Sequence, residues 1–155
     1  MRARRRVIVH THDSDQTRDL GRLLGSLVRP GDVLVLEGDL GAGKTTFTQG
    51  LGAGLGVVEP VTSPTFVVAR EHRGSGVELA HIDAYRISSL AEWDDLDIDL
   101  ERGVTVIEWG DRIAAALPED HLRIRFREES PGRVLEFTTA GPRSAALLSL
   151  LESAA

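Results

Sequence analysis

The chain has 155 residues, of which 41% are hydrophobic and 27% are charged, and its formal net charge is -6 at pH 7. This length suits one compact domain spanning residues 1–155 and is short for two. Because the chain has no cysteine, disulfides, thiolate nucleophiles and cysteine-based metal sites are excluded, and its negative charge disfavours wrapping of nucleic acid by the whole surface.

Apolar segments that fit strands alternate with amphipathic segments that fit helices, which predicts an α/β domain. The predicted strands are 7–10, 33–36, 66–70, 77–82, 104–107, 122–126 and 134–138. The predicted helices are 14–28, with Ser14 as N-cap, a helix after a glycine-rich loop that ends near Gly54 or Gly56, and 142–152. Residues 1–6 are expected to be a solvated, flexible tail.

The turn-forming segment 128–132 separates the last two predicted strands, which indicates a C-terminal hairpin followed by a helix. The sheet is therefore expected to be mixed, mostly parallel and flanked by helices. No apolar run reaches the roughly 20 residues of a membrane-spanning helix, and the apolar segment near the start is too short for a signal peptide. We expect a cytoplasmic protein without a membrane contact.

Residues 38–45 read Gly-Asp-Leu-Gly-Ala-Gly-Lys-Thr, a full match to the phosphate-binding loop known as Walker A, between a predicted strand and a predicted helix. Lys44 is the only lysine of the chain, and every other Lys or Arg position is arginine. A compact ammonium at this one position indicates a site that a planar guanidinium would not fit. The glycines allow backbone N–H groups to converge on phosphate oxygens at a helix N-terminus. Lys44 is expected to bridge the outer phosphates, and the Thr45 hydroxyl to bind Mg²⁺.

Two carboxylates end apolar strands, Asp83 after 77–82 and Glu108 after 104–107. Open α/β sheets bind ligands at this carboxyl edge. One acid would hold Mg²⁺, directly or through water, and the other would orient or deprotonate an attacking water. Each acid taken alone is also compatible with a simple strand-end cap.

Four further features keep two interpretations each. The segment 62–66, with Thr65, is either a switch-type loop that aims hydroxyls at a γ-phosphate or a stiff entry to the next strand. His81 is either a proton carrier or a satisfied histidine on a strand, and Trp109 is either a core plug or a lid over the site. The acidic segment 93–101 is either a docking ridge or an ordinary solvated loop or short helix.

Four motifs, in this order and at these intervals, resemble the TsaE (YjeE) family: Gly-Asp-Leu-Gly-Ala-Gly-Lys-Thr-Thr at 38–46, Ser-Pro-Thr-Phe at 63–66, His-Ile-Asp-Ala-Tyr-Arg at 81–86 and Glu-Trp at 108–109. The resemblance implies a small P-loop ATPase, with ATP as substrate and Mg²⁺ as cofactor. It also implies that the protein assists the TsaB–TsaD pair in making threonylcarbamoyladenosine (t6A) in tRNA. The transfer itself is credited to TsaD, and tRNA would be reached only through these partners.

The resemblance also implies the site residues. The nucleotide would be bound by Thr17, Asp39, Leu40, Gly41, Ala42, Gly43, Lys44, Thr45, Thr46, Thr65, Trp109 and Arg133, with Thr17 and the Gly132–Arg133 turn framing the adenine. Mg²⁺ would be held by Thr45 and Glu108. Lys44, Asp83 and Glu108 would be catalytic, with Asp83 assisting hydrolysis.

Other classes stay open. A small-molecule or nucleoside kinase uses the same loop and metal, but it needs an acceptor pocket and usually a mobile, arginine-bearing lid, and the best lid candidate here, 70–76, is short and fits a hairpin turn. A GTPase is disfavoured because a chain without asparagine cannot form the guanine-reading Asn-Lys-x-Asp motif. A nucleotide-gated binding module with negligible turnover is a third class. Slow intrinsic hydrolysis is expected because no arginine is assigned as an in-place finger, although Arg86 is a candidate.

Overall fold

The computed structural model describes residues 4–39, 43–58, 61 and 69–155. The strands are β1 (Arg6–Thr11), β2 (Val33–Gly38), β3 (Ala69–Arg73), β4 (Glu78–Asp83), β5 (Gly103–Glu108), β6 (Leu122–Glu129) and β7 (Gly132–Thr138). The helices are α1 (Ser14–Gly25), α2 (Lys44–Gly54), α3 (Leu90–Asp95) and α4 (Pro142–Ala154), with two 3-10 segments, η1 (Ala84–Arg86) and η2 (Gly110–Ala116). Within the described ranges, no helix is both long and apolar enough to cross a membrane.

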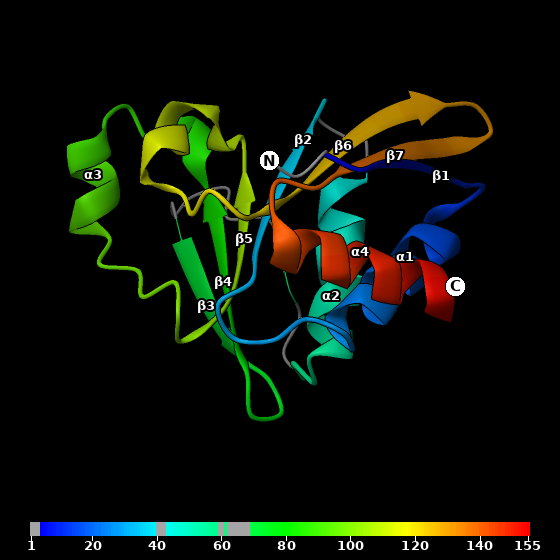
Figure 1. Ribbon diagram of the computed structural model, residues 1–155, viewed down its shortest axis with the longest axis horizontal. Coiled ribbons are helices and arrows are strands. Elements are labelled where there is room, and N and C mark those ends of the chain that lie inside the picture. The colour runs from blue at the N-terminus through cyan, green and yellow to red at the C-terminus, as the bar shows by residue number, and fades with distance from the viewer. Residues whose placement is uncertain (1–3, 40–42, 59–60, 62–68) are drawn as a thin grey trace.

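The strands form one sheet in the order β1-β7-β6-β2-β5-β4-β3 (Figure 1). The central strands β6, β2, β5 and β4 are parallel to their neighbours in that group. The pairs β1–β7, β6–β7 and β3–β4 are antiparallel. The predicted α/β domain with a mixed sheet, a C-terminal hairpin and a last helix is confirmed, and its parallel part is the centre, where ligands of such sheets bind.

Both faces of the central strands are buried. On one face Leu34, Leu36 and Val106 contribute to a core cluster with Phe47 and Leu51 of α2. Figure 1 shows α1, α2 and α4 grouped together, and residues of all three helices belong to this cluster. The side chains that alternate with these along β2, Val33 and Val35, point to the opposite face. There they belong to a second cluster with residues of α3, η1 and η2. This two-sided burial explains the uninterrupted apolar run of β2.

Helices α1 and α2 cross with their backbones in contact, because glycines of each helix lie against the backbone of the other. A Cβ added to Gly50 would lie 2.0 Å from the carbonyl oxygen of Arg18, and one added to Gly21 would lie 2.2 Å from that of Phe47. Only hydrogen side chains fit such an approach. The crossing brings the beginning of α1 beside the beginning of α2, and a Cβ added to Gly43 would lie 3.7 Å from Cγ2 of Thr17.

Several predicted boundaries are wrong by a few residues. The carboxylate of Asp13, and not the Ser14 hydroxyl, caps α1 by accepting from the backbone N–H of Gln16, and the helix ends at Gly25 instead of residue 28. The strand predicted at 66–70 is seen as β3, which runs to Arg73, while its predicted beginning lies outside the described residues.

The tail expectation fails for Arg5 and Arg6. Arg6 begins β1. The backbone N–H of Arg5 donates to Thr139 Oγ1, and the Arg5 guanidinium contacts Ser149 and Glu152 on α4. Part of the arginine-rich start therefore ties β1 to the last helix.

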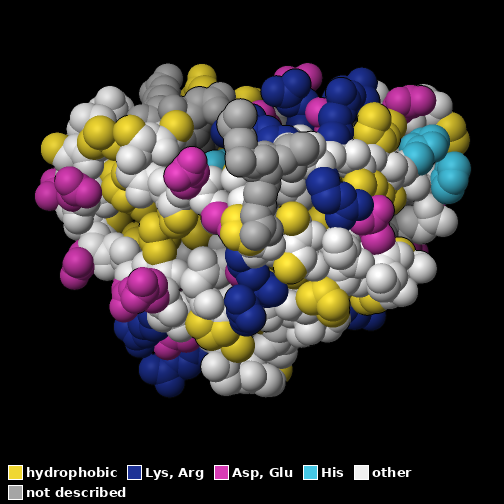
Figure 2. All heavy atoms as spheres, in the orientation of Figure 1, with side chains coloured by type: hydrophobic (Ala, Val, Ile, Leu, Met, Phe, Trp, Pro, Cys, Tyr) yellow, Lys and Arg dark blue, Asp and Glu magenta, His cyan; other side chains and the backbone are white. Residues whose placement is uncertain are grey.

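The acidic segment 93–101 holds the last residues of α3 and the loop after it. Trp93 is buried, and Leu96, Ile98 and Leu100 pack against the second core cluster, while the carboxylates between them face solvent. Figure 2 shows acidic side chains spread over the side of the molecule where α3 lies. The alternation of apolar and acidic residues thus has a structural cause, and a docking role for this ridge stays a prediction.

Candidate functional site

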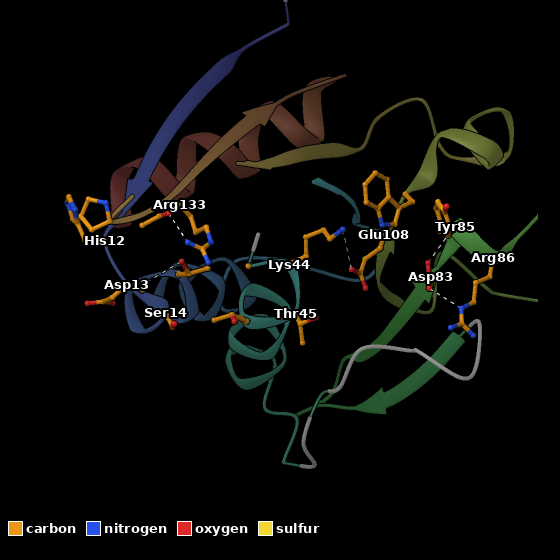
Figure 3. Close-up of a pocket in the computed structure, with 16 residues that line it drawn as sticks. His12, Asp13, Ser14, Lys44, Thr45, Asp83, Tyr85, Arg86, Glu108 and Arg133 are labelled. Atoms are coloured by element: carbon orange, nitrogen blue, oxygen red, sulfur yellow. Dashed lines mark hydrogen bonds and ion pairs between the residues drawn. The ribbon is translucent and has the colours of Figure 1, made fainter. Parts of the chain in front are cut away.

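A pocket of about 650 Å³ lies at the carboxyl edge of the central strands. It extends from the beginning of α1 and the β6–β7 turn, past the beginning of α2, to the ends of β4 and β5 (Figure 3). It is lined by His12, Asp13, Ser14, Thr17, Gly43, Lys44, Thr45, Thr46, Asp83, Tyr85, Arg86, Glu108, Trp109, Pro131, Gly132 and Arg133. The pocket therefore joins distant parts of the chain at the edge where the sequence predicts ligand binding.

The start of α2 forms the middle of the pocket. Gly43 has a φ of 106° and is the N-cap of the helix, a left-handed conformation that favours glycine. Lys44, Thr45 and Thr46 form the first turn, in which backbone N–H groups have no partner within the helix. Such a helix start is suited to an anion, because its donors and its dipole both favour negative charge.

Lys44 is buried, with a relative exposure of 6%, and its ammonium is held by three neighbours. Nζ donates to the carbonyl oxygen of Gly38 at 2.6 Å, lies 4.0 Å from Glu108 Oε1, and sits 4.1 Å from the centre of the Trp109 ring. Burial lowers the pKa of Lys44 below its ordinary value of 10.5, while the charges of Glu108, Asp83 and Asp39 oppose this shift. Figure 3 shows the side chain pointing along the pocket toward Glu108.

The two acids are register partners on the parallel strands β4 and β5, so both carboxylates leave the sheet on the same face. Glu108 is buried at 6% exposure, and its Oε2 lies 2.8 Å from Nε2 of the fully buried His81. Asp83 is half-buried, accepts from the backbone N–H of Tyr85 at 3.1 Å, and lies 3.5 Å from Nε of Arg86. Glu108 is thus fixed within the protein, and Asp83 stands nearer to solvent.

Trp109 follows Glu108 in a left-handed conformation with a φ of 61°, which is rare for a bulky residue. Its backbone N–H donates to the carbonyl oxygen of Leu36 at 3.0 Å. Its half-buried ring lies below the Lys44 ammonium and meets Tyr85 edge-to-face, with ring centres 6.0 Å apart. The ring lines the pocket, so Trp109 belongs to the site and is not a plug of the core.

The far end of the pocket is built from α1 and the hairpin (Figure 3). The hydroxyl of the buried Thr17 is already engaged, at 2.7 Å from Thr11 Oγ1 and 3.3 Å from the carbonyl oxygen of Asp13. Arg133 donates to the carbonyl oxygen of Gly132 and pairs with Glu128 at 3.4 Å. Because its hydroxyl is already bonded, Thr17 can meet a ligand only through van der Waals contact. Arg133 adds a partly exposed positive charge.

Most of the predicted site residues that the structure describes meet in this pocket. They are Thr17, Gly43, Lys44, Thr45, Thr46, Asp83, Glu108, Trp109 and Arg133. Asp39 is exposed and is not part of the lining, so the structure gives it only an electrostatic effect on Lys44. Leu40, Gly41, Ala42 and Thr65 lie outside the described residues.

Sequence reasoning missed the pocket residues His12, Asp13, Tyr85 and Pro131, and it named Ser14 only as a helix cap. Tyr85 carried a usable signal, because it follows the strand-end Asp83 by two residues. His12 and Pro131 carried none, because only the folded arrangement of the β1–α1 junction and the β6–β7 turn brings them to the pocket.

The residues fit a magnesium ion. Within the described part of the chain, no group of three or more His, Asp or Glu side chains gathers as an all-protein metal cage. Mg²⁺ does not need one, since it usually takes one or two protein oxygens and fills its other positions with water and substrate phosphate. The Thr45 hydroxyl and the Glu108 carboxylate supply such oxygens from the wall of one pocket.

Comparison with known proteins gives consistent matches. A family model described as threonylcarbamoyl adenosine biosynthesis protein TsaE matches residues 11–135. The tRNA threonylcarbamoyladenosine biosynthesis protein TsaE of Streptomyces coelicolor is 56% identical over 114 residues, which are 70% of this chain and 77% of that protein. The TsaE protein of Bacillus subtilis is 39% identical over 137 residues, 86% of this chain and 85% of that protein.

A solved structure agrees with these matches. The crystal structure of Bacillus subtilis YdiB has a TM-score of 0.83 and 34% sequence identity, and the superposition covers 99% of this chain and 98% of that one. The four ordered motifs, the pocket that unites three of them, and these matches lead to one conclusion. The chain belongs to the TsaE family of threonylcarbamoyladenosine biosynthesis proteins.

Proposed function

We propose that this protein is a magnesium-dependent ATPase of the cytoplasm that acts as an accessory of the TsaB–TsaD pair when t6A is made in tRNA. One observation carries the ATPase part: Lys44, Thr45, Asp83 and Glu108 line the same pocket at the carboxyl edge of a parallel sheet. A phosphate-binding helix start, metal-compatible oxygens and a water-positioning acid are the parts that phosphoryl transfer needs. Family membership supports the t6A part.

In this proposal the start of α2 binds the phosphates. Backbone N–H groups of the first turn face the negative charge, and the Lys44 ammonium moves its contacts from Gly38 to phosphate oxygens. Thr45 and Glu108 would hold Mg²⁺, which when bound would neutralise charge on the phosphate oxygens. The low exposure of Lys44 and Glu108 strengthens their electrostatic effect on a bound phosphate.

Asp83 serves as the acid that orients the attacking water. Its carboxylate lines the pocket one strand away from Glu108 and faces the same edge. Arg86 lies beside it, 3.5 Å from Asp83 Oδ2, and is the candidate for stabilising charge that develops on the transferred phosphoryl group. Because Arg86 is engaged with Asp83 and remains 42% exposed, slow turnover by the isolated chain is expected.

The partner side is proposed from family membership together with the exposure at the pocket mouth. Tyr85 is 61% exposed although it contacts Trp109, which itself contacts Lys44. A protein that covers Tyr85 would therefore be linked to the proposed phosphate site through the contacts of Tyr85 with Trp109 and of Trp109 with Lys44. Nucleotide state and partner binding would be coupled through these side chains, and tRNA would be reached only through the partners.

The test is phosphate release by the purified chain under three conditions: alone, with TsaB–TsaD, and with candidate small-molecule acceptors. The proposal predicts slow, magnesium-dependent release that the partner pair changes and that the acceptors do not. A kinase would instead phosphorylate an acceptor and release little phosphate, and a binding module would turn over under none of the conditions. The lid candidate of a kinase is only the β3–β4 hairpin turn, so no observation favours that class.

A further inference from the structure

His81 is a buried polar side chain that the proposed mechanism has not used. It lies on β4, two residues before Asp83 on the same face of the strand, and its side chain is 0% exposed. Nε2 lies 2.8 Å from Oε2 of Glu108 on the neighbouring strand β5. A buried polar side chain costs free energy unless it is hydrogen-bonded, so this contact accounts for half of the polar atoms of the ring.

The direction of the bond follows from its two partners. A carboxylate oxygen accepts, so Nε2 must carry the hydrogen. Nδ1 has no hydrogen-bond partner among the described residues, and this tautomer leaves it as an unfilled acceptor. The other tautomer would set two acceptors against each other at 2.8 Å and would bury an unpaired N–H, which is the costlier arrangement.

The bond decides what the rest of Glu108 does. A glutamate side chain has three rotatable bonds, and fixing one carboxylate oxygen on a rigid strand removes most of that freedom. With Oε2 on His81, the second oxygen faces the pocket, 4.0 Å from Lys44 Nζ. His81, Glu108 and Lys44 therefore form a row that runs from the interior of the sheet to the phosphate loop.

We propose that His81 is a positioning residue for Glu108. Its Nε2–H holds Oε2 so that Oε1 is presented to the place where Lys44 and the metal-bearing phosphates meet. This inference rests on the proposed function and adds the reason why Glu108 adopts one orientation. Partners that orient metal-binding side chains in this way typically change metal affinity or activity by about 10–100-fold when they are removed.

A purely structural role for His81 makes a different prediction. If the ring only fills space in the protein interior, an apolar side chain of similar volume would serve as well and would leave no unfilled acceptor. His81→Leu provides that side chain. His81→Gln provides the matched control, because the amide of glutamine places a donor near the position of the histidine Nε2.

The experiment compares the native chain, His81→Leu and His81→Gln by calorimetric titration with ATP, once with saturating Mg²⁺ and once with a chelator. We expect His81→Leu to reduce the gain in affinity that Mg²⁺ confers by about 10–100-fold while binding without Mg²⁺ is unchanged. His81→Gln should recover most of the gain. An unchanged gain in His81→Leu, or an equal loss in both variants, would overturn the proposal.

A second measurement needs no variant of His81 and so does not depend on its folding. Nitrogen-15 NMR of the histidine rings should show the His81 hydrogen on Nε2, and Glu108→Gln should shift that signal while the other histidines keep theirs. A hydrogen on Nδ1 with none on Nε2 in the native chain would overturn the proposed contact. If Mg²⁺ adds nothing to ATP binding in the native chain, the proposed function itself fails, whereas a magnesium effect that His81→Leu leaves intact contradicts only the role of His81.

Discussion

The two ends of the pocket are built in different ways. At the strand end, the Lys44 side chain reaches from α2 to within 4.0 Å of Glu108, which contacts His81 behind the pocket wall, and all three are at most 6% exposed. At the far end, His12 and Asp13 are exposed, and the Asp13 carboxylate is already used to cap α1. The first end is a cluster of buried ionisable side chains, and the second is an open surface between a helix and a hairpin.

This difference suggests that the strand end carries the chemistry of the pocket and that the far end contributes to binding. Burying ionisable side chains such as Lys44 and Glu108 costs free energy, and buried groups of this kind cluster at functional sites. The open end is lined by exposed side chains and by the partly exposed Arg133, and we expect it to contribute to binding mainly through its shape. We therefore expect substitutions at the strand end to abolish function and substitutions at the far end to adjust affinity.

The largest expected effect is that of Lys44→Ala, which removes the ammonium from the strand end. ATP affinity should fall by about 100-fold or more, because a hydrogen bond to a charged group contributes about 1.5–3 kcal/mol and the ammonium offers several. Lys44→Arg keeps the charge but not the shape, and it should restore little of the loss. Isothermal calorimetry measures both, and near-native affinity in Lys44→Arg would show that charge alone matters there.

Asp83→Asn comes next and separates binding from turnover. The variant should bind Mg–ATP with near-native affinity and release phosphate about 100-fold more slowly, because a positioned acid or base typically contributes about 100-fold to 10,000-fold. A coupled phosphate-release assay gives the rate, and Asp94→Asn on the exposed side of α3 is the control that should change nothing. Intact hydrolysis in Asp83→Asn would show that the assigned role is wrong.

Arg133→Ala tests the far end, where we expect a smaller change. Arg133 is partly exposed and is paired with Glu128, so its loss should weaken ATP binding by no more than about tenfold and leave the rate at saturation unchanged. Arg127→Ala on the same hairpin points away from the pocket and is the matched control. A loss as large as that of Lys44→Ala would remove the contrast between the two ends.

The smallest effect concerns the pH dependence of stability. Since burial lowers the pKa of Lys44 below 10.5, the unfolded chain binds more protons than the folded chain between the lowered pKa and 10.5. The contribution of Lys44 to the free energy of unfolding should therefore rise with pH across that interval. Urea denaturation of the native chain and of Lys44→Ala over an alkaline pH series isolates it, and parallel curves for the two proteins would contradict the predicted burial penalty.

Much of the strand end was predictable from the sequence, because its demands are local. The sequence shows a glycine loop between a strand and a helix, and two acids at the ends of apolar strands. Both patterns place their residues at the carboxyl edge of a sheet, and Lys44, Asp83 and Glu108 indeed line one pocket there. The C-terminal hairpin was predictable for the same reason, since residues 128–132 form a turn by composition.

What could not be predicted depends on contacts between distant segments. His81 and Glu108 are 27 residues apart, and no local pattern tells which side chain the histidine meets. The far end of the pocket exists because glycines such as Gly21 and Gly50 let α1 approach α2 closely. The cap of α1 was misplaced by one residue because Asp13 and Ser14 are both good caps, and only the backbone geometry selects between them.

The most direct test of the central claim is a calorimetric titration of the native chain with ATP, in the presence and in the absence of Mg²⁺. The arrangement of Lys44, Thr45 and Glu108 in one pocket predicts saturable ATP binding that Mg²⁺ strengthens. A native chain that shows no magnesium-dependent affinity for adenine nucleotides would contradict the assignment of this pocket as an ATPase site.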